Sequence, residues 1–246
     1  MPSSSHPPRK RFGQHFLHER RVLEKIVDAL ALSPQDFLVE IGPGQGALTR
    51  HLSGKAHLEV VEIDRDLAAG LASEFPDLAV HCGDALELDF AEFPAGLRIV
   101  GNLPYNVSTP MLFHLARYAS RVRDMHFMLQ LEVVERMVAA PSTAAYGRLS
   151  VSLQSRFRMQ KLFKVAAGAF RPPPKVESAF VRMVPLDWQL PIDEDLLRKA
   201  FSARRKTLRN ALPDVDFEAA GIDSGLRPEN LSPEDYARLS MAKGGP

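Results

Sequence analysis

Residues 39–49, VEIGPGQGALT, decide the fold of this chain because they predict a short apolar strand, a glycine-rich turn and the first turn of a helix. Glycine at such a turn lets the backbone approach a ligand closely and adopt φ angles that other residues avoid. The spacing is G-x-G-x-G, which differs from the dinucleotide pattern G-x-G-x-x-G, and no Gly-Lys-Ser/Thr follows. We therefore expect an α/β fold whose ligand lacks a polyphosphate.

Two apolar runs further along the chain end in acidic residues. Residues 58–64, LEVVEID, predict a second strand whose Glu62 is suited to accept both hydroxyls of a ribose, whereas Asp64 begins the next helix. Residues 78–82, LAVHC, predict a third strand that leads to Asp84, which either accepts the N6 amine of an adenine or caps a helix. Glu62 and Asp84 are therefore candidate ligands of a nucleoside.

A polar turn, GNLPYN at residues 101–106, follows a fourth apolar run. The Asn102 side-chain oxygen and the Leu103 carbonyl are expected to face one amino group, while Pro104 fixes the backbone φ. Tyr105 offers a flat face on which a base can stack. Asn and Pro also form ordinary turns, so the motif gains its weight from the sequence upstream of it. This turn predicts a site that holds a planar exocyclic amine.

Length and composition limit the class of protein. With 246 residues, 45% of them hydrophobic, the chain can bury the core of one large domain and a small one. No uninterrupted apolar run of about 18 residues predicts a transmembrane helix, and the start of the chain lacks the apolar core of a secretion signal. The single cysteine, Cys82, is expected to be a buried, inert thiol, and the eight histidines show no ligand spacing. We expect a metal-free cytoplasmic protein.

Positive charge is concentrated in two segments. Residues 156–209 hold thirteen Lys or Arg against five Asp or Glu, and residues 1–25 hold six against two. These excesses of eight and four positive charges leave a net charge of −11 for the rest of the chain, because the total is +1. Such a separation is typical of a protein that binds a polyanion.

Residues 198–209 are expected to form one helix within the basic segment. Its core-facing side would hold Leu197, Ala200, Phe201 and Leu208. Its outward side would present four cations to RNA phosphates, namely Arg204, Arg205, Lys206 and Arg209. A solvated cationic face is the alternative interpretation.

Four separated motifs resemble those of the small-subunit ribosomal RNA adenine N6,N6-dimethyltransferases, the kasugamycin-sensitivity enzymes. In the order of that family they are RFGQHFL at 11–17, EIGPGQG at 40–46, NLPYN at 102–106 and FRPPPKVES at 170–178. The resemblance extends from about residue 10 to the last helices. It implies a class I methyltransferase fold, which is a Rossmann-like, mostly parallel seven-stranded sheet with helices on both faces, plus a small C-terminal all-helical domain.

The resemblance also implies roles for individual residues. It places these residues at S-adenosyl-L-methionine: His15, Leu17, Gly42, Gly44, Glu62, Asp84 and Asn102. The methyl-transfer centre would contain Asn102, Leu103 and Tyr105, with Phe170 as a second stacking platform unless that ring belongs to the core. The family usually has Asn at the position of His15, so the role of this histidine departs from the pattern.

The expected organisation is a disordered tail at residues 1–9, a catalytic domain at residues 10–185 and a helical domain at residues 186–246. The expected activity is dimethylation of N6 on two adjacent adenosines near the 3′ end of small-subunit ribosomal RNA, by a monomer that contributes to subunit biogenesis. Three alternatives remain: a large-subunit adenine methyltransferase of the antibiotic-resistance type, a ribosome-assembly factor whose binding outweighs its catalysis, and a methyltransferase acting on DNA or small-molecule amines.

Overall fold

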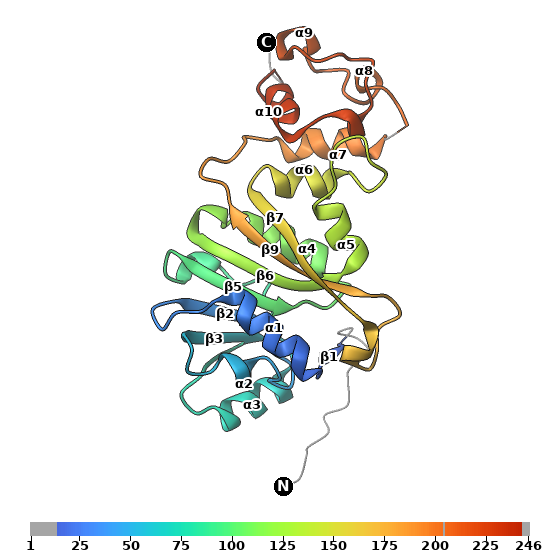
Figure 1. Ribbon diagram of the computed structural model, residues 1–246. Helices are drawn as coiled ribbons and strands as arrows, with labels where there is room; N and C mark the ends of the chain where they lie inside the picture. The colour runs from blue at the N-terminus through green and yellow to red at the C-terminus, as the bar shows by residue number, and fades with distance from the viewer. Residues whose placement is uncertain (1–13, 204, 243–246) are drawn as a thin grey trace. The chain divides into compact units, whose positions relative to one another are not determined.

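The computed structural model describes residues 14–203 and 205–242, so the expected tail at residues 1–9 and the side chain of Arg204 lie outside the described residues. A seven-stranded sheet forms the centre of the fold (Figure 1). Its strands, in spatial order, are β4 (Ala79–Cys82), β3 (His57–Glu62), β2 (Phe37–Ile41), β5 (Leu97–Asn102), β6 (Val122–Gln130), β9 (Ser178–Pro185) and β7 (Phe157–Val165).

The first five strands in this order are parallel to their neighbours, and β9 pairs antiparallel with β6. Strands β2, β5 and β6 are buried along most of their length, as is typical of parallel strands covered on both faces. The mostly parallel seven-stranded sheet expected from the sequence is confirmed.

The first four α-helices alternate with the parallel strands, and the remaining ones lie further along the chain. The chain has ten α-helices within the described residues. They are α1 (Arg20–Leu30), α2 (Thr49–Leu52), α3 (Arg65–Glu74), α4 (Ser108–Ala116), α5 (Leu131–Met137), α6 (Arg148–Gln154), α7 (Glu194–Ser202), α8 (Leu208–Ala211), α9 (Phe217–Ala220) and α10 (Pro233–Ala242). Short 3-10 turns lie at Phe90–Glu92, Ala119–Arg121, Ala167–Ala169 and Pro228–Asn230. Helix α1 is amphipathic. Its residues Leu23, Ile26 and Leu30 recur at helical spacing and are all buried in the core against the sheet.

A separate two-stranded sheet joins the start of the described chain to a segment far along the sequence. Strand β1 (Phe16–Leu17) pairs antiparallel with β8 (Phe170–Arg171). We call residues 14–17 the N-terminal arm. The pairing fixes this arm beside the proline-rich loop that follows β8.

The chain divides into two compact units. One unit contains residues 1–131 and 160–183, and the other contains residues 132–159 and 184–246. This division differs from the expected boundary after residue 185, because Tyr146 and Val151 are buried in the same core as the C-terminal helices. The Tyr146 hydroxyl also donates to the Leu231 carbonyl at 2.8 Å.

Two local expectations are wrong. Residues 198–209 do not form one helix, because α7 ends at Ser202 and α8 begins only at Leu208, after an extended Thr207. The four apolar positions still face inward. Cys82 is exposed, not buried, because β4 is an edge strand of the sheet.

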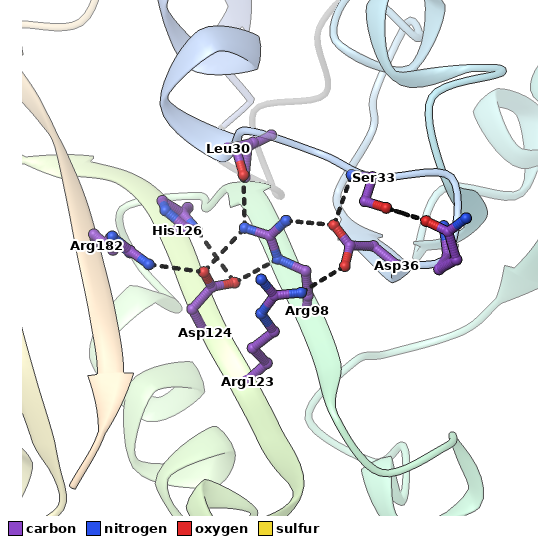
Figure 2. Close-up of polar contacts among 9 residues, drawn as sticks. Leu30, Ser33, Asp36, Arg98, Arg123, Asp124, His126 and Arg182 are labelled. Atoms are coloured by element: carbon purple, nitrogen blue, oxygen red, sulfur yellow. Dashed lines mark hydrogen bonds and ion pairs between the residues drawn. The ribbon is translucent and has the colours of Figure 1, made fainter.

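A buried ionic cluster joins the amino ends of three strands, at the edge of the sheet where β2, β5 and β6 begin. Figure 2 shows Arg98 between two carboxylates. Its guanidinium donates to Asp36 at 2.7 Å and to Asp124 at 2.8 and 2.9 Å, and also to the Leu30 carbonyl at the end of α1. The Arg98 side chain is 3% exposed and the two carboxylates are 6% and 2% exposed.

His126 lies beside this cluster and is fully buried, with its ring stacked on Phe180. Burial lowers the pKa of His126 to about 4, although the Asp124 carboxylate opposes the shift. The imidazole is therefore neutral at pH 7.

Candidate active site

A cavity of about 1650 Å³ opens at the carboxyl ends of the parallel strands. Open α/β sheets bind their ligands at this edge. Pockets for small molecules usually measure about 300–1,000 Å³, so this larger cavity has room for a second group beside one small molecule. Nearly all residues that the sequence assigned to the cofactor or to methyl transfer line it: His15, Leu17, Gly42, Gly44, Glu62, Asp84, Asn102, Leu103 and Tyr105.

The glycine loop after β2 forms one wall of the cavity. Gly42 and Gly44 have φ of +67° and +59°, a region that side chains strain. A Cβ on Gly44 would lie 2.9 Å from the Phe16 ring, so the loop and the N-terminal arm pack closer than any side chain allows. This close packing explains why the arm lines the cavity.

Glu62 lies at the end of β3 with only 3% exposure. One carboxylate oxygen accepts from the Gly44 N–H and the other from the Asp64 N–H, both at 2.9 Å. Burial raises the pKa of Glu62, and these backbone donors partly offset the shift. The carboxylate keeps acceptor capacity for a further donor, because it accepts about four hydrogen bonds in total. As expected, Asp64 caps α3 by accepting from the Asp66 N–H.

Asp84 follows β4 and is half-buried. One carboxylate oxygen accepts from the Leu86 N–H at 2.9 Å, which caps a turn and not a helix. The same residue lines the cavity. The local cap and a role toward a ligand are therefore compatible.

Two cavity residues were not singled out from the sequence. Glu40, inside the glycine motif, is 2% exposed and accepts from the Thr49 hydroxyl at 2.7 Å. Burial raises its pKa to about 7, with Thr49 opposing the shift and the Glu62 charge adding to it. Ile63 is 42% exposed, which is unusual for a large apolar side chain directly after a buried strand. The sequence did carry a signal for Ile63, since it is an apolar residue between two acids, Glu62 and Asp64.

Asn102 ends β5 and its side chain has a defined orientation. Its amide nitrogen donates to the His15 carbonyl at 2.8 Å. Because a carbonyl oxygen only accepts hydrogen bonds, the NH₂ group must face it, and the Asn102 oxygen is left to accept from a ligand. Gly101 makes the position possible, since a Cβ there would lie 2.6 Å from the Ile41 carbonyl on the neighbouring strand.

Tyr105 and His15 lie beside each other in the cavity wall. Their ring centroids are 5.4 Å apart, and the Tyr105 hydroxyl shares a 2.7 Å hydrogen bond with the Ser178 hydroxyl. Burial raises the pKa of Tyr105, and the bond to Ser178 opposes the shift. The His15 Nδ1 donates to the Pro172 carbonyl at 2.7 Å. Tyr105 therefore has a fixed ring position.

Phe170 does not join this arrangement. It is 2% exposed, belongs to the core that includes Leu17 and Phe180, and is absent from the cavity wall. The core-packing alternative describes its position, so a stacking role for this ring gains no support.

The cationic residues assigned to RNA lie in the other unit. Arg205, Lys206 and Arg209 are exposed, and Arg204 is outside the described residues. Their role toward RNA stays a prediction.

The charges of the cavity wall favour a cationic ligand. Its acids are Glu40, Glu62, Asp66, Glu74 and Asp84, and its arginines are Arg50 and Arg171. Arg50 is already paired with Glu74 through bonds of 2.6 and 2.7 Å. Within the described residues, no helix is long and apolar enough to cross a membrane, and His, Cys, Asp and Glu form no group suited to a metal ion.

Four features together define a class I methyltransferase. They are a mostly parallel Rossmann-like sheet, a glycine loop after β2, a buried acid at the end of β3 and an Asn-Leu-Pro-Tyr turn at the end of β5. The family model described as ribosomal RNA adenine dimethylase matches residues 5–243. The chain belongs to this family, and the family resemblance noted from its motifs is confirmed.

Individual relatives agree with this assignment. The chain is 57% identical to ribosomal RNA small subunit methyltransferase A of Chromobacterium violaceum over 96% of both chains. It is 56% identical to the protein of the same name from Aromatoleum aromaticum, over 96% of this chain and 94% of the other.

Two solved structures share the fold over almost the whole chain. A dimethyladenosine transferase from Plasmodium falciparum is 26% identical, with a TM-score of 0.81 over 92% of this chain and 96% of that one. The 23S rRNA methyltransferase ErmE is also 26% identical, with a TM-score of 0.69 over 93% of this chain and 99% of that one.

Proposed function

We propose that this protein transfers methyl groups from S-adenosylmethionine to N6 of two adjacent adenosines near the 3′ end of small-subunit ribosomal RNA, and acts during subunit biogenesis. The observation that carries the proposal is the position of Asn102, which lines the same cavity as the glycine loop and Glu62 and whose amide nitrogen is engaged with the His15 carbonyl, so that its oxygen is left to accept from a ligand. Membership of the ribosomal RNA adenine dimethylase family supplies the substrate class.

The residues of the cavity fit S-adenosylmethionine, which supplies an electrophilic methyl group on a positively charged sulfur. Gly42 and Gly44 leave space for close approach of a ligand to the backbone. Glu62 would accept the ribose hydroxyls and Asp84 the adenine amine, while Ile63 offers an exposed apolar surface to the adenine ring. Leu17 and the backbone of His15 would close the site from the arm.

The protein would act on the target mainly by positioning it. The N6 lone pair of adenine is delocalised into the ring, so N6 is a poor nucleophile. The Asn102 oxygen and the Leu103 carbonyl would accept the two N6 hydrogens and favour a tetrahedral nitrogen. Two neutral dipoles would also stabilise the positive charge that grows on N6, and the proton would leave to water. Tyr105 would stack on the base once it leaves its own stack.

The large-subunit alternative is the nearest competitor because its members share the fold. The curated relatives described above carry small-subunit names, and the structural agreement is better with the dimethyladenosine transferase than with ErmE. The decisive experiment is incubation of the protein with labelled S-adenosylmethionine and each undermethylated ribosomal subunit, followed by mass spectrometry of the nucleosides. Dimethyladenosine should form only in small-subunit RNA, and its formation only in large-subunit RNA would refute the proposal.

Glu62→Ala should raise the dissociation constant of S-adenosylmethionine roughly 10- to 100-fold, because hydrogen bonds to a charged group contribute about 1.5–3 kcal/mol. Calorimetry measures the constant, and circular dichroism checks that the variant still folds. The matched control is Glu87→Ala, which removes an exposed acid outside the cavity wall. An unchanged constant in Glu62→Ala would remove this residue from the cofactor site.

Replacing Arg205, Lys206 and Arg209 together by Ala should weaken binding to ribosomal RNA and flatten its salt dependence. Each lost phosphate contact lowers the magnitude of the slope of log affinity against log salt by about 0.7 on single-stranded RNA. Filter binding at several salt concentrations measures this slope. Arg198→Ala is the control, because Arg198 is exposed but paired with Asp195 at 3.1 Å. An unaltered slope in the triple variant would mean that this face is only solvated.

A further inference from the structure

The loop at residues 171–177 borders the cavity and carries two exposed cations. Arg171 is exposed and lines the cavity, and Lys175 is exposed beyond the three prolines that separate them. Neither cation has an ion-pair partner among the residues that the structure describes. Arg50, the other cation of the cavity wall, is by contrast paired with Glu74.

Both ends of this loop are attached to residues of the site. Arg171 pairs with Phe16 in the small sheet, and the Pro172 carbonyl accepts from His15 at 2.7 Å. At the other end, the Glu177 carbonyl accepts from the Leu131 N–H at 2.9 Å. The next residue, Ser178, is bonded to Tyr105. The two attachments, to His15 and Tyr105, place the loop next to the expected stacking position.

The tip between these attachments is stiff. Proline fixes φ, so the run Pro172–Pro174 loses little conformational entropy when the loop binds a partner. Four residue steps separate Arg171 from Lys175, so their backbones are at most about 14 Å apart. Such a pair can contact backbone phosphates on both sides of one nucleotide. Val176, 48% exposed, adds an apolar surface beside Lys175.

We propose that Arg171 and Lys175 bind the RNA phosphates that flank the target adenosine, so that the catalytic unit has its own backbone clamp, separate from the cations at residues 205–209. The inference rests on the proposed function, because it assumes that the base entering the cavity belongs to RNA. Contacts to phosphates fix the position of the RNA along the protein without recognising its bases. Because the loop is attached to Tyr105, this fixed position also aligns the target base with the expected stacking ring.

The test is the salt dependence of binding to an unmethylated fragment of small-subunit RNA. Arg171→Ala/Lys175→Ala should lower the magnitude of the slope by about 1.4, the value for two contacts on single-stranded RNA. Lys55→Ala/Arg117→Ala is the matched control, since it removes two exposed cations outside the cavity wall. Its slope should equal that of the unmodified protein. Lys175→Ala alone, at the exposed tip, should give about half the effect without disturbing β8.

A slope unchanged by the loop double variant, or one changed equally by both double variants, would overturn the clamp. Arg171→Lys/Lys175→Arg should keep the slope, because both charges remain. Failure of the proposed function would be seen separately, in the unmodified protein. That protein would then form no dimethyladenosine in small-subunit RNA. Binding of S-adenosylmethionine, measured by calorimetry, should persist in Lys175→Ala.

Discussion

Asn102→Ala is expected to reduce methyl transfer to ribosomal RNA by about 10²–10³-fold or more, the cost of removing one preorganised dipole from a reaction centre. The amide oxygen is the group that the structure leaves available, since the amide nitrogen is engaged with the His15 carbonyl. Binding of S-adenosylmethionine should change far less, because Glu62 and the glycine loop remain. Single-turnover transfer of a labelled methyl group measures the loss, and calorimetry measures the binding.

Asn106→Ala is the matched control for this variant. It removes an exposed amide from the same turn and the same cavity wall. A rate for Asn102→Ala within a few-fold of the Asn106→Ala rate would contradict the role of Asn102.

Asn102→Ala also separates catalysis from binding. If it abolishes methylation but leaves subunit binding and maturation intact, the assembly role outweighs the catalytic one.

Arg98→Ala is expected to lower the free energy of unfolding by about 3–5 kcal/mol, because it removes the buried cation that two buried carboxylates share. Asp36 retains Arg123 at 2.7 Å and Asp124 retains Arg182 at 3.3 Å, but the side chains of these two arginines are 62% and 45% exposed. The Leu30 carbonyl also loses its donor, so the end of α1 loosens from the sheet. Urea unfolding followed by circular dichroism measures the change.

Arg123→Ala is the control for the buried cluster, since its side chain is 62% exposed and makes one contact with Asp36. Exposed pairs contribute about 0.2–1 kcal/mol, so this variant should be close to the unmodified protein. Equal losses of unfolding free energy in Arg98→Ala and Arg123→Ala would show that burial does not determine how much the cluster contributes to stability.

The parts of the fold that depend on local sequence were predictable. The glycine loop, the acids that end β3 and the turn after β5 combine short-range patterns with the rule that parallel strands end at one edge. Glu62, Asn102 and Tyr105 therefore line one cavity as expected.

The remaining features depend on neighbours that the local sequence does not specify. Cys82 is exposed because β4 has a partner on one side only. Phe170 is buried because its pairing with Leu17 places it in the core. The division into units follows from long-range burial of Tyr146, and the break before α8 follows from backbone bonds of Leu208 and Arg209 to residues 224–226.

The bond between Asn102 and residue 15 uses only the main-chain oxygen of that residue. Any amino acid at this position supplies the same acceptor. An exchange of Asn for His there thus leaves the reactive amide oriented as before, because the main chain of residue 15 and not its side chain holds it.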